Sequence, residues 1–414
     1  MKKNHFLPAA LAAVCALSLS SCRDYGDSAL QPESMAGWSY ESYVQLYEVL
    51  WNNVNSSYIF WDVDTVDWDA RYEECLPLFQ ALDTRRTAGD TVTLAEYGQV
   101  CKQLFAGLTD HHMSIKLRNP FPAPGEENMA FIINIGIDEV MRREGYHASV
   151  DASLSAVLDS LQARGRVSSL DTASVPGLDF HCAACLLDDT IAYLRFNEFA
   201  FTEVRHAASG TPQARAWQVL QSWKKLIADR ASAALIDCRS NGGGYCDDLS
   251  LILSPFLEKD LSLGRYRSKQ GMGRLDYSPW CPLVCPAGAD SVKAMPVAVL
   301  CDMMSVSMAE ICTYAVRQLP SGCAVGERTF GATGPLEQDL FDRTYGGPYG
   351  NIQTDFYEVY TSTYEWHTPK GCLEGVGVTP DLEVKTDPQQ LLLGIDDQME
   401  MALMYLRADT TIVR

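Results

Sequence analysis

Hydrophobic and polar positions follow a helical period in the first part of this chain. From Trp38 to about Leu108, apolar residues recur every three or four positions, which is the spacing of amphipathic helices. The runs that begin at Tyr43 and at Tyr97 show this spacing most clearly. The pattern predicts an N-terminal helical domain over residues 38–118.

Short apolar runs of strand length alternate with helical patterns from Thr190 onward. The runs that predict strands are 191–196, 233–237, 297–301 and 324–326, with a hairpin arm at 356–364. The patterns that predict helices are 214–228, 249–257, 307–319 and a closing helix at 389–406. Repeated strand–helix–strand units are typical of an α/β core. Residues 189–414 are therefore expected to form an α/β domain.

The region between these two parts has a weaker pattern. Residues 119–188 are mixed, and one apolar run at 130–135 predicts a strand. We expect a small mixed β subdomain there.

The first 21 residues have the features of a secretory signal. A basic start at Lys2 and Lys3 precedes an apolar run over 6–19, which is short for a membrane span. The sequence Leu19-Ser-Ser-Cys22 resembles a bacterial lipobox. By that resemblance Cys22 is the lipidated first residue, and residues 22–37 are a tether to a membrane of the cell envelope. An ordinary signal peptide with a chance cysteine is the alternative.

Charge and cysteine content narrow the set of partners. The net charge is −20, and without the two lysines of the signal it is −22, which argues against nucleic acid or an anionic membrane surface. The close cysteine pairs Cys182/Cys185 and Cys281/Cys285 lie too far apart in sequence for a zinc ribbon. We therefore expect no metal, and the pairing of the cysteines stays open.

Three further segments carry candidate chemistry. A predicted strand runs into the glycines of residues 242–244, where backbone N–H groups can point together at an anion or a developing oxyanion. Ser305 and Ser307 lie at the start of a predicted helix, where a serine is a nucleophile or a simple N-cap. His111 and His112 follow the N-terminal helices and offer a base or a metal ligand.

Taken in chain order, these segments resemble the S41 family of C-terminal processing and tricorn-like serine proteases, over roughly residues 38–385. The motifs that carry the resemblance are Leu108-Thr-Asp-His-His112, Asp237-Cys-Arg-Ser-Asn-Gly-Gly-Gly244, Ser305-Val-Ser-Met-Ala-Glu310, Gly326-Glu-Arg-Thr-Phe-Gly331 and Leu373-Glu-Gly-Val-Gly-Val-Thr-Pro-Asp381. The resemblance implies a crotonase-like (ClpP/crotonase-type) ββα core. Family members often carry a PDZ-like domain, so residues 119–188 are either a degenerate PDZ or a small β subdomain.

The resemblance also implies roles for particular residues. Ser307 is the nucleophile. The lysine that serves as base in the C-terminal processing branch is replaced by Ala332. The tricorn-like branch uses a histidine instead, which aligns with His112, while His111 occupies the place of a glycine.

The remaining roles follow the same motifs. Glu374 is the carboxylate that orients the imidazole, and Glu310 is the alternative. The oxyanion donors are the N–H groups of Gly243 or Gly244 and of Met308, and the supporting residues are Glu310, Asp237 and Asn241.

The function implied is that of a lipid-anchored serine endopeptidase of the cell envelope. It would hydrolyse peptides or unfolded proteins through a Ser/His/Glu acyl-enzyme mechanism without a cofactor. A catalytically inactive S41-like lipoprotein that binds a peptide or small ligand is the main alternative. A crotonase-like acyl-CoA enzyme is a third, and an export signal argues against it because acyl-CoA substrates are cytosolic.

Overall fold

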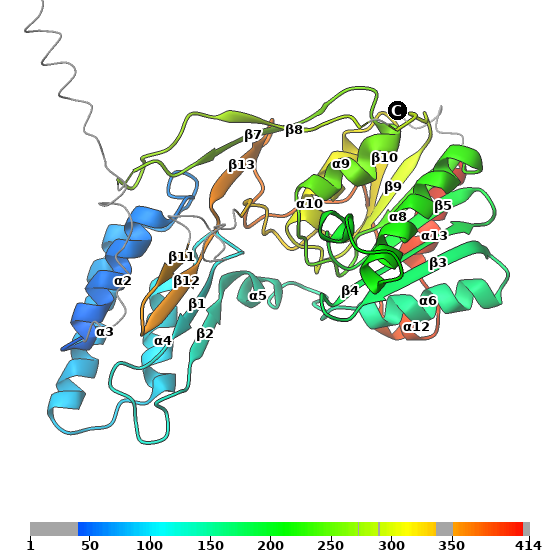
Figure 1. Ribbon diagram of the computed structural model, residues 1–414. Helices are drawn as coiled ribbons and strands as arrows, with labels where there is room; N and C mark the ends of the chain where they lie inside the picture. Colours follow the sequence, from blue (N-terminus) through cyan, green and yellow to red (C-terminus); the bar gives the residue numbers. More distant parts are fainter. Residues whose placement is uncertain (1–39, 272, 289, 337–350, 409–414) are drawn as a thin grey trace, which may run out of the picture.

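The structure is a computed structural model that describes residues 40–271, 273–288, 290–336 and 351–408. The chain forms two lobes that are bridged by long strands (Figure 1). Cys22 and the expected signal and tether lie outside the described residues. Among the described helices, none combines the length and the apolar character needed to cross a bilayer.

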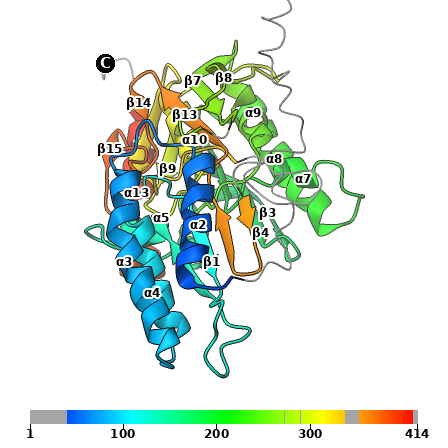
Figure 2. The ribbon, with the colours of Figure 1, turned by 90° about the vertical axis from the view of Figure 1, so that its left-hand side faces the viewer.

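The N-terminal lobe packs helices against a four-stranded sheet. Its helices are α2 (Tyr43–Ser57), α3 (Trp68–Thr87) and α4 (Leu94–Phe105), which lie together at the front of Figure 2. Its sheet has the order β11-β12-β1-β2, with β1 (Ser114–Leu117), β2 (Phe131–Asn134), β11 (Asn351–Gln353) and β12 (Tyr357–Tyr360). The expected helices are present, and strands from two distant parts of the chain complete the lobe.

A seven-stranded sheet forms the second lobe, in the order β15-β10-β9-β6-β5-β4-β3. Its strands are β3 (Val167–Val175), β4 (Phe180–Leu187), β5 (Ile191–Phe196), β6 (Ala233–Asp237), β9 (Val297–Cys301), β10 (Gly322–Gly326) and β15 (Leu382–Glu383). Pairing is parallel from β15 to β5 and antiparallel from β5 to β3.

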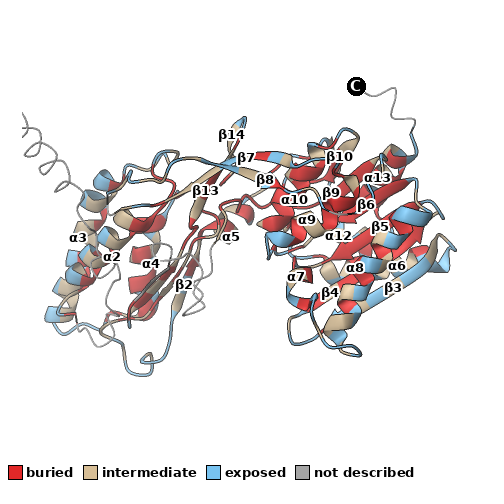
Figure 3. Ribbon diagram, turned by 45° about the horizontal axis from the view of Figure 1, so that its top comes forward, coloured by how far each residue is buried: buried red, intermediate tan, exposed pale blue. Residues whose placement is uncertain are grey.

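The inner strands β4, β5, β6, β9 and β10 are buried on both faces and are red in Figure 3, whereas the edge strand β3 is largely exposed. The side chains of β5 alternate between faces: Leu194 packs in one core cluster with α8 (Pro212–Asp229) and α10 (Met308–Arg317), and Tyr193 in another with α6 (Asp151–Ala163) and α13 (Asp397–Arg407). A strand that is buried on both sides needs apolar residues at every position, which explains why these strands are continuous apolar runs.

A third sheet bridges the lobes in the order β14-β13-β7-β8. Its strands are β7 (Leu261–Ser268), β8 (Cys281–Cys285), β13 (Tyr364–Thr368) and β14 (Gly371–Cys372). The remaining elements are α5 (Ile135–Val140), α7 (Phe201–Val204), α9 (Asp247–Leu253), η2 (Ser254–Phe256) and α12 (Pro388–Leu392).

The strands predicted at 191–196, 233–237 and 297–301 are confirmed with the same bounds. The expected closing helix differs, because it divides into α12 and α13 around Gly394, which has a φ of +71°. A positive φ ends a helix, and glycine adopts it readily.

Residues 119–188 also differ from the expected β subdomain. Their first strand, β2, pairs with β1 in the N-terminal lobe, whereas β3 and β4 pair with each other and with β5 in the seven-stranded sheet. The described residues of this segment are thus divided between the two lobes. A pattern of local hydrophobicity carries no information on which distant strand an edge will pair with.

The parallel register brings the ends of four strands to one edge of the core. Asp237 pairs with Arg195 and with Leu300, and Gly326 pairs with Cys301, so β5, β6, β9 and β10 end side by side. Ligands of such sheets bind outside the carboxyl ends of the strands. The glycine turn and the Ser305–Glu310 segment both begin at this edge.

A buried ion-pair network holds the end of β6. The Arg239 guanidinium donates from Nε to Asp237 Oδ1 (2.9 Å) and from Nη2 to Oδ2 (2.7 Å), and its Nη1 bonds Asp396 (2.9 Å). Tyr193 also donates to Asp237 Oδ2 (2.9 Å). Burial alone raises the pKa of the Asp237 carboxyl, but the adjacent Arg239 makes the net shift downward. Asp237 therefore anchors the end of β6, from which the glycine turn begins.

Removal of this carboxylate charge is expected to destabilise the fold. Asp237→Asn should lower the free energy of unfolding by about 3 kcal/mol, because breaking a buried pair leaves a buried guanidinium undercompensated. Urea unfolding of residues 23–414, which retain every described residue, measures it. The control is Asp229→Asn, which removes an exposed i,i+4 pair with Lys225 and should change little. An equal loss in the free energy of unfolding for the two variants would contradict a stabilising role of the buried Asp237–Arg239 pair.

Candidate functional site

Ser307 stands between the turn after β9 and the first residue of α10. Its backbone has φ +58° and ψ −118°, a conformation that costs a non-glycine residue about 1–3 kcal/mol. Ser307 N–H donates to Ala332 O (3.1 Å) and to Glu310 Oε2 (3.1 Å). A serine held on a strained strand-to-helix turn is the geometry of a nucleophile elbow.

Ser305 has a different position in the same turn. It is fully buried, and its Oγ donates to Cys238 O (2.7 Å) and accepts from Asp302 N–H (3.0 Å). Ser307 is partly exposed. Of the two serines, Ser305 braces the turn and Ser307 is accessible for chemistry.

The glycine turn lies against Ser307. A Cβ on Gly243 would come within 2.6 Å of Ser307 Cβ, so only glycine fits there without movement. The N–H of Gly243 donates to Asn241 Oδ1 (2.9 Å), and Val306 N–H donates to Asn241 O (2.9 Å). Asn241 thus ties the glycine turn to the nucleophile turn.

This bond bears on the expected oxyanion donors. Because Gly243 N–H is already bonded to Asn241, it is not free to bind an oxyanion in this structure. Within the described part of the chain, the N–H groups of Gly244 and Met308 have no hydrogen-bond acceptor. They are the pair of donors that remain beside Ser307.

Ser307 and His112 line one cavity of about 570 Å³ together with Gly243, Gly244 and Met308. His112 Nε2 is buried and has no hydrogen-bond partner among the described residues. Burial lowers the pKa of the His112 imidazole to about 4, so the ring is neutral at neutral pH and can accept a proton.

His111 does not line that cavity. Its ring is directed to the turn after β10, where Nδ1 lies 3.2 Å from Phe330 O. Its backbone N–H donates to Glu374 Oε1 (2.8 Å). Of the two neighbouring histidines, only His112 lines the cavity with Ser307.

The register of the N-terminal sheet positions the His112 ring. Ser114 pairs with Tyr360, which places His112 beside Ser362, and Nδ1 lies 3.5 Å from Ser362 Oγ. Ser362 Oγ donates to Asp110 Oδ1 (3.0 Å), and that oxygen also accepts from His112 N–H (2.9 Å). Sequence reasoning did not identify Ser362, because no motif near it signals the contact.

Glu374 lies close to His112 but has other hydrogen-bond partners. One carboxylate oxygen is within 4.8 Å of a His112 ring nitrogen. Its Oε2 accepts from Thr333 N–H (2.5 Å) and Gly334 N–H (2.6 Å). Burial, followed by the nearby Asp110 carboxylate, raises the pKa of Glu374 well above its ordinary value. In this structure Glu374 orders the turn after β10 and stands near the imidazole without bonding to it.

Glu310 is a brace within the same turns. Its carboxylate accepts from Ser307 N–H, Thr329 Oγ1 (2.5 Å), Gly331 N–H (2.7 Å) and Ala332 N–H (2.8 Å). Burial raises its pKa to about 7. Glu310 therefore holds the turn of β10 against the nucleophile turn and does not reach His112.

A second cavity of about 360 Å³ adjoins the first and shares Met308 and Ile311 with it. Its other walls include Leu263, Leu283 and Tyr266. An apolar pocket beside a nucleophile suits an apolar substrate side chain. Among the described residues that line the larger cavity, the ionisable groups besides His112 are acidic, Glu198 and Asp247, or the weak acids Tyr245, Cys246 and Tyr360.

Two groups of side chains could in principle hold a metal: Asp110, His112 and Glu374, and Glu365, His367 and Cys372. In the first group, both carboxylates already accept hydrogen bonds from backbone and hydroxyl groups. In the second, Glu365 is paired with Arg267 and His367. The carboxylates of both groups thus already have hydrogen-bond or ion-pair partners within the protein.

All twelve cysteines in the described ranges are free thiols.

Residues 190–384 match Peptidase family S41. This segment, a little under half of the chain, is thus similar to the S41 peptidases. The carboxy-terminal processing protease CtpB of Bacillus subtilis (strain 168) is 28% identical over 163 residues, which are 39% of this chain and 30% of that protein. The match thus spans less than a third of the relative's length. Ser307 and Glu374 lie inside the S41 segment, whereas His112 precedes it.

Solved structures share the fold at low sequence identity. A protein from Parabacteroides merdae ATCC 43184, described as a candidate peptidase, has a TM-score of 0.63 and 20% identity, over 91% of this chain and 100% of that one. Mature CPAF has a TM-score of 0.57 and 11% identity, over 90% and 99% of the two chains. CPAF complexed with lactacystin has a TM-score of 0.55 and 12% identity, over 88% and 97%. The whole chain therefore has an S41-like mixed α/β fold.

The strain at Ser307 gives a testable stability difference. Glycine adopts a positive φ at little cost, whereas alanine keeps the steric conflict of serine. Ser307→Gly should therefore be more stable than Ser307→Ala by about 1 kcal/mol. Urea unfolding of the two variants provides the comparison, and a glycine variant no more stable than the alanine variant would show that the turn is unstrained.

Proposed function

We propose that this chain is a serine endopeptidase in which Ser307 is the nucleophile and His112 is the general base. The observation that carries the proposal is the shared cavity. It is lined by Ser307 on its strained turn, by His112, whose Nε2 has no partner among the described residues, and by Gly244 and Met308, whose N–H groups have no acceptor among them. Those parts are what acyl transfer needs, namely a nucleophile, a proton acceptor and oxyanion donors.

The proposed mechanism follows from these positions. Ser307 Oγ attacks a peptide carbonyl while His112 Nε2 accepts the hydroxyl proton. The N–H groups of Gly244 and Met308 stabilise the oxyanion, and His112 then donates the proton to the leaving amine. In the second half of the reaction, water attacks the acyl-enzyme while His112 accepts its proton, and His112 then returns a proton to Ser307 Oγ. Ala332 occupies the place of the family's lysine, which supports histidine as base and the tricorn-like branch.

The third member of the proposed triad is a carboxyl group near the His112 ring. Glu374 is the carboxylate near the imidazole, and Asp110 reaches His112 Nδ1 through Ser362 Oγ. We propose Glu374 as the carboxyl group of the triad and Ser362 as the residue that fixes the ring. Glu310 acts as the brace of the nucleophile turn.

The substrate is proposed to be a peptide or an unfolded protein with an apolar side chain beside the scissile bond. The apolar pocket next to Ser307 supports that choice, and the acidic lining disfavours anionic substrates. The same proposal includes a crotonase-like core and a lipid anchor at Cys22 that holds the enzyme at the cell envelope. An inactive S41-like binding lipoprotein is the alternative that the experiment below separates.

Cleavage of casein by residues 23–414 tests the assignment of both residues. Ser307→Ala should abolish cleavage, and His112→Ala should lower kcat by a factor of about 100 or more. The matched control is His111→Ala, whose ring lies outside the cavity and which should keep most of the activity.

Three outcomes would count against the proposal. Equal cleavage by Ser307→Ala would point to another nucleophile. Greater loss in His111→Ala than in His112→Ala would exchange the two roles. Binding of casein without cleavage by the native chain would favour the inactive alternative.

A further inference from the structure

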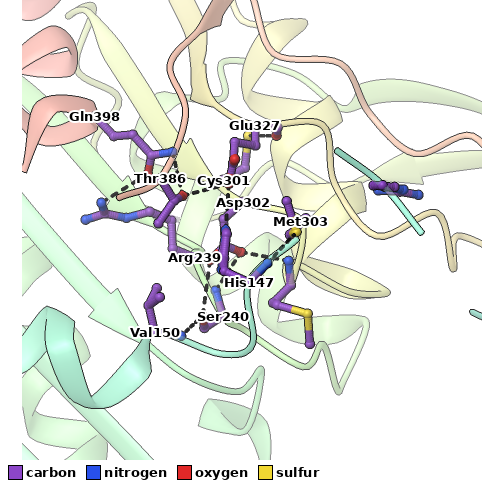
Figure 4. Close-up of polar contacts among 12 residues, drawn as sticks. His147, Val150, Arg239, Ser240, Cys301, Asp302, Met303, Glu327, Thr386 and Gln398 are labelled. Carbon is purple, nitrogen blue, oxygen red and sulfur yellow. Dashed lines mark hydrogen bonds and ion pairs between the residues drawn. The ribbon is translucent and has the colours of Figure 1, made fainter. Parts of the chain in front are cut away.

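A cluster of ionisable side chains is buried behind the nucleophile turn and outside the cavity. It consists of His147, Glu327 and Asp302 with Ser240, and we call it the Asp302 cluster (Figure 4). None of the four residues lines the cavity that holds Ser307. Buried ionisable groups cost free energy unless they are paired, so the cluster's partners explain its presence.

His147 and Glu327 form an ion pair at the end of β10. His147 Nε2 lies 2.8 Å from Glu327 Oε2, and Nδ1 lies 2.9 Å from Ala148 O. Both ring nitrogens face acceptors, which requires a proton on each and therefore an imidazolium. Although burial lowers the pKa of His147, the carboxylate and carbonyl partners make the net shift upward.

Asp302 joins the two turns of the candidate site. Its Oδ1 accepts from Ser240 N–H (2.9 Å) and Met304 N–H (3.1 Å), and its Oδ2 accepts from Ser240 Oγ (3.1 Å). Ser240 begins the glycine turn with a φ of +53°, and Met304 belongs to the nucleophile turn. One carboxylate thus fixes the spacing between the oxyanion donors and the nucleophile.

The same cluster contacts the segment that leads from the N-terminal lobe into the core. After β2 and α5, residues 147–150 cross to the core and bond both turns. His147 N–H donates to Met303 Sδ (3.4 Å), and Val150 N–H donates to Ser240 Oγ (2.9 Å). The N-terminal lobe also carries His112. The crossing segment therefore connects the part of the protein that holds the base to the turns that hold the nucleophile.

We propose that the His147–Glu327 pair and Asp302 are positioning residues for catalysis. They hold the crossing segment, the glycine turn and the nucleophile turn in one arrangement, without touching the substrate. This inference rests on the proposed peptidase function, and it adds residues that act through Ser307 and His112.

Kinetics of Glu327→Gln and His147→Gln test the inference in residues 23–414. Each variant should lower kcat about tenfold, because a small displacement of the nucleophile affects the chemical step. KM should stay within about twofold of the native value, since no cluster member contacts the cavity. The double variant should lose no more than either single variant, because the two side chains act as one pair.

A matched control removes a different half-buried ion pair. Asp188 lies in the turn between β4 and β5, at the opposite edge of the sheet from Ser307, and pairs with Arg166 and Arg407. Asp188→Asn should leave kcat unchanged. A comparable loss of kcat in this control would show a general effect of destabilisation and would overturn the inference.

Hydrogen exchange gives a readout that does not depend on peptidase activity. Peptides that cover 238–245 and 302–308 should exchange faster in Glu327→Gln than in the native chain, and at the native rate in Asp188→Asn. Unchanged exchange in both turns would overturn the positioning role even if casein is not cleaved. Faster exchange with native kcat would overturn the catalytic consequence. A chain that cleaves nothing but shows the exchange difference would refute the proposed function and not the role of the cluster in ordering the turns.

Discussion

Parallel pairing of β5, β6, β9 and β10 is the constraint on which the candidate site depends. Because these strands end in register, the turns that follow them meet at one edge of the sheet. Ser307, the glycine turn and the turn after β10 are then near enough for one network of hydrogen bonds. Asn241, Glu310 and Asp302 form that network, and each of them bonds more than one turn.

The proposed base comes from outside that edge. His112 belongs to the N-terminal lobe, where pairing of β1 with β12 sets the position of its ring against Ser362. The site therefore requires the two lobes to keep a defined relation. The bridging sheet and the crossing segment at residues 147–150 supply two connections, and the second of them reaches the nucleophile turn directly through the Asp302 cluster.

The sequence predicted the parts of the fold that depend on local patterns. Buried strands such as 191–196 are continuous apolar runs, and the motifs gave the S41 resemblance that the match over 190–384 supports. The role of Ser307 stays a prediction. The closing helix was predicted as one piece because the effect of Gly394 depends on its backbone conformation. Residues 119–188 were misread as a unit because strand partners lie far away in sequence.

Within the candidate site, the features that the sequence could not predict also depend on long-range packing. The occupied N–H of Gly243 depends on the rotamer of Asn241, which no motif specifies. The role of Ser362 depends on the register of β12, and the choice between His111 and His112 depends on which ring the start of β1 directs to the cavity. Long-range packing decides each of these points, and local spacing does not.

Covalent labelling would show whether Ser307 is an activated nucleophile. Residues 23–414 would be treated with a fluorophosphonate, which phosphonylates activated serines with loss of fluoride, independently of the peptide sequence that the enzyme prefers. Intact mass and a peptide map would then locate the adduct. We expect one adduct, on Ser307, that forms much more slowly in His112→Ala. An adduct on Ser305, or none on the folded native chain, would contradict it.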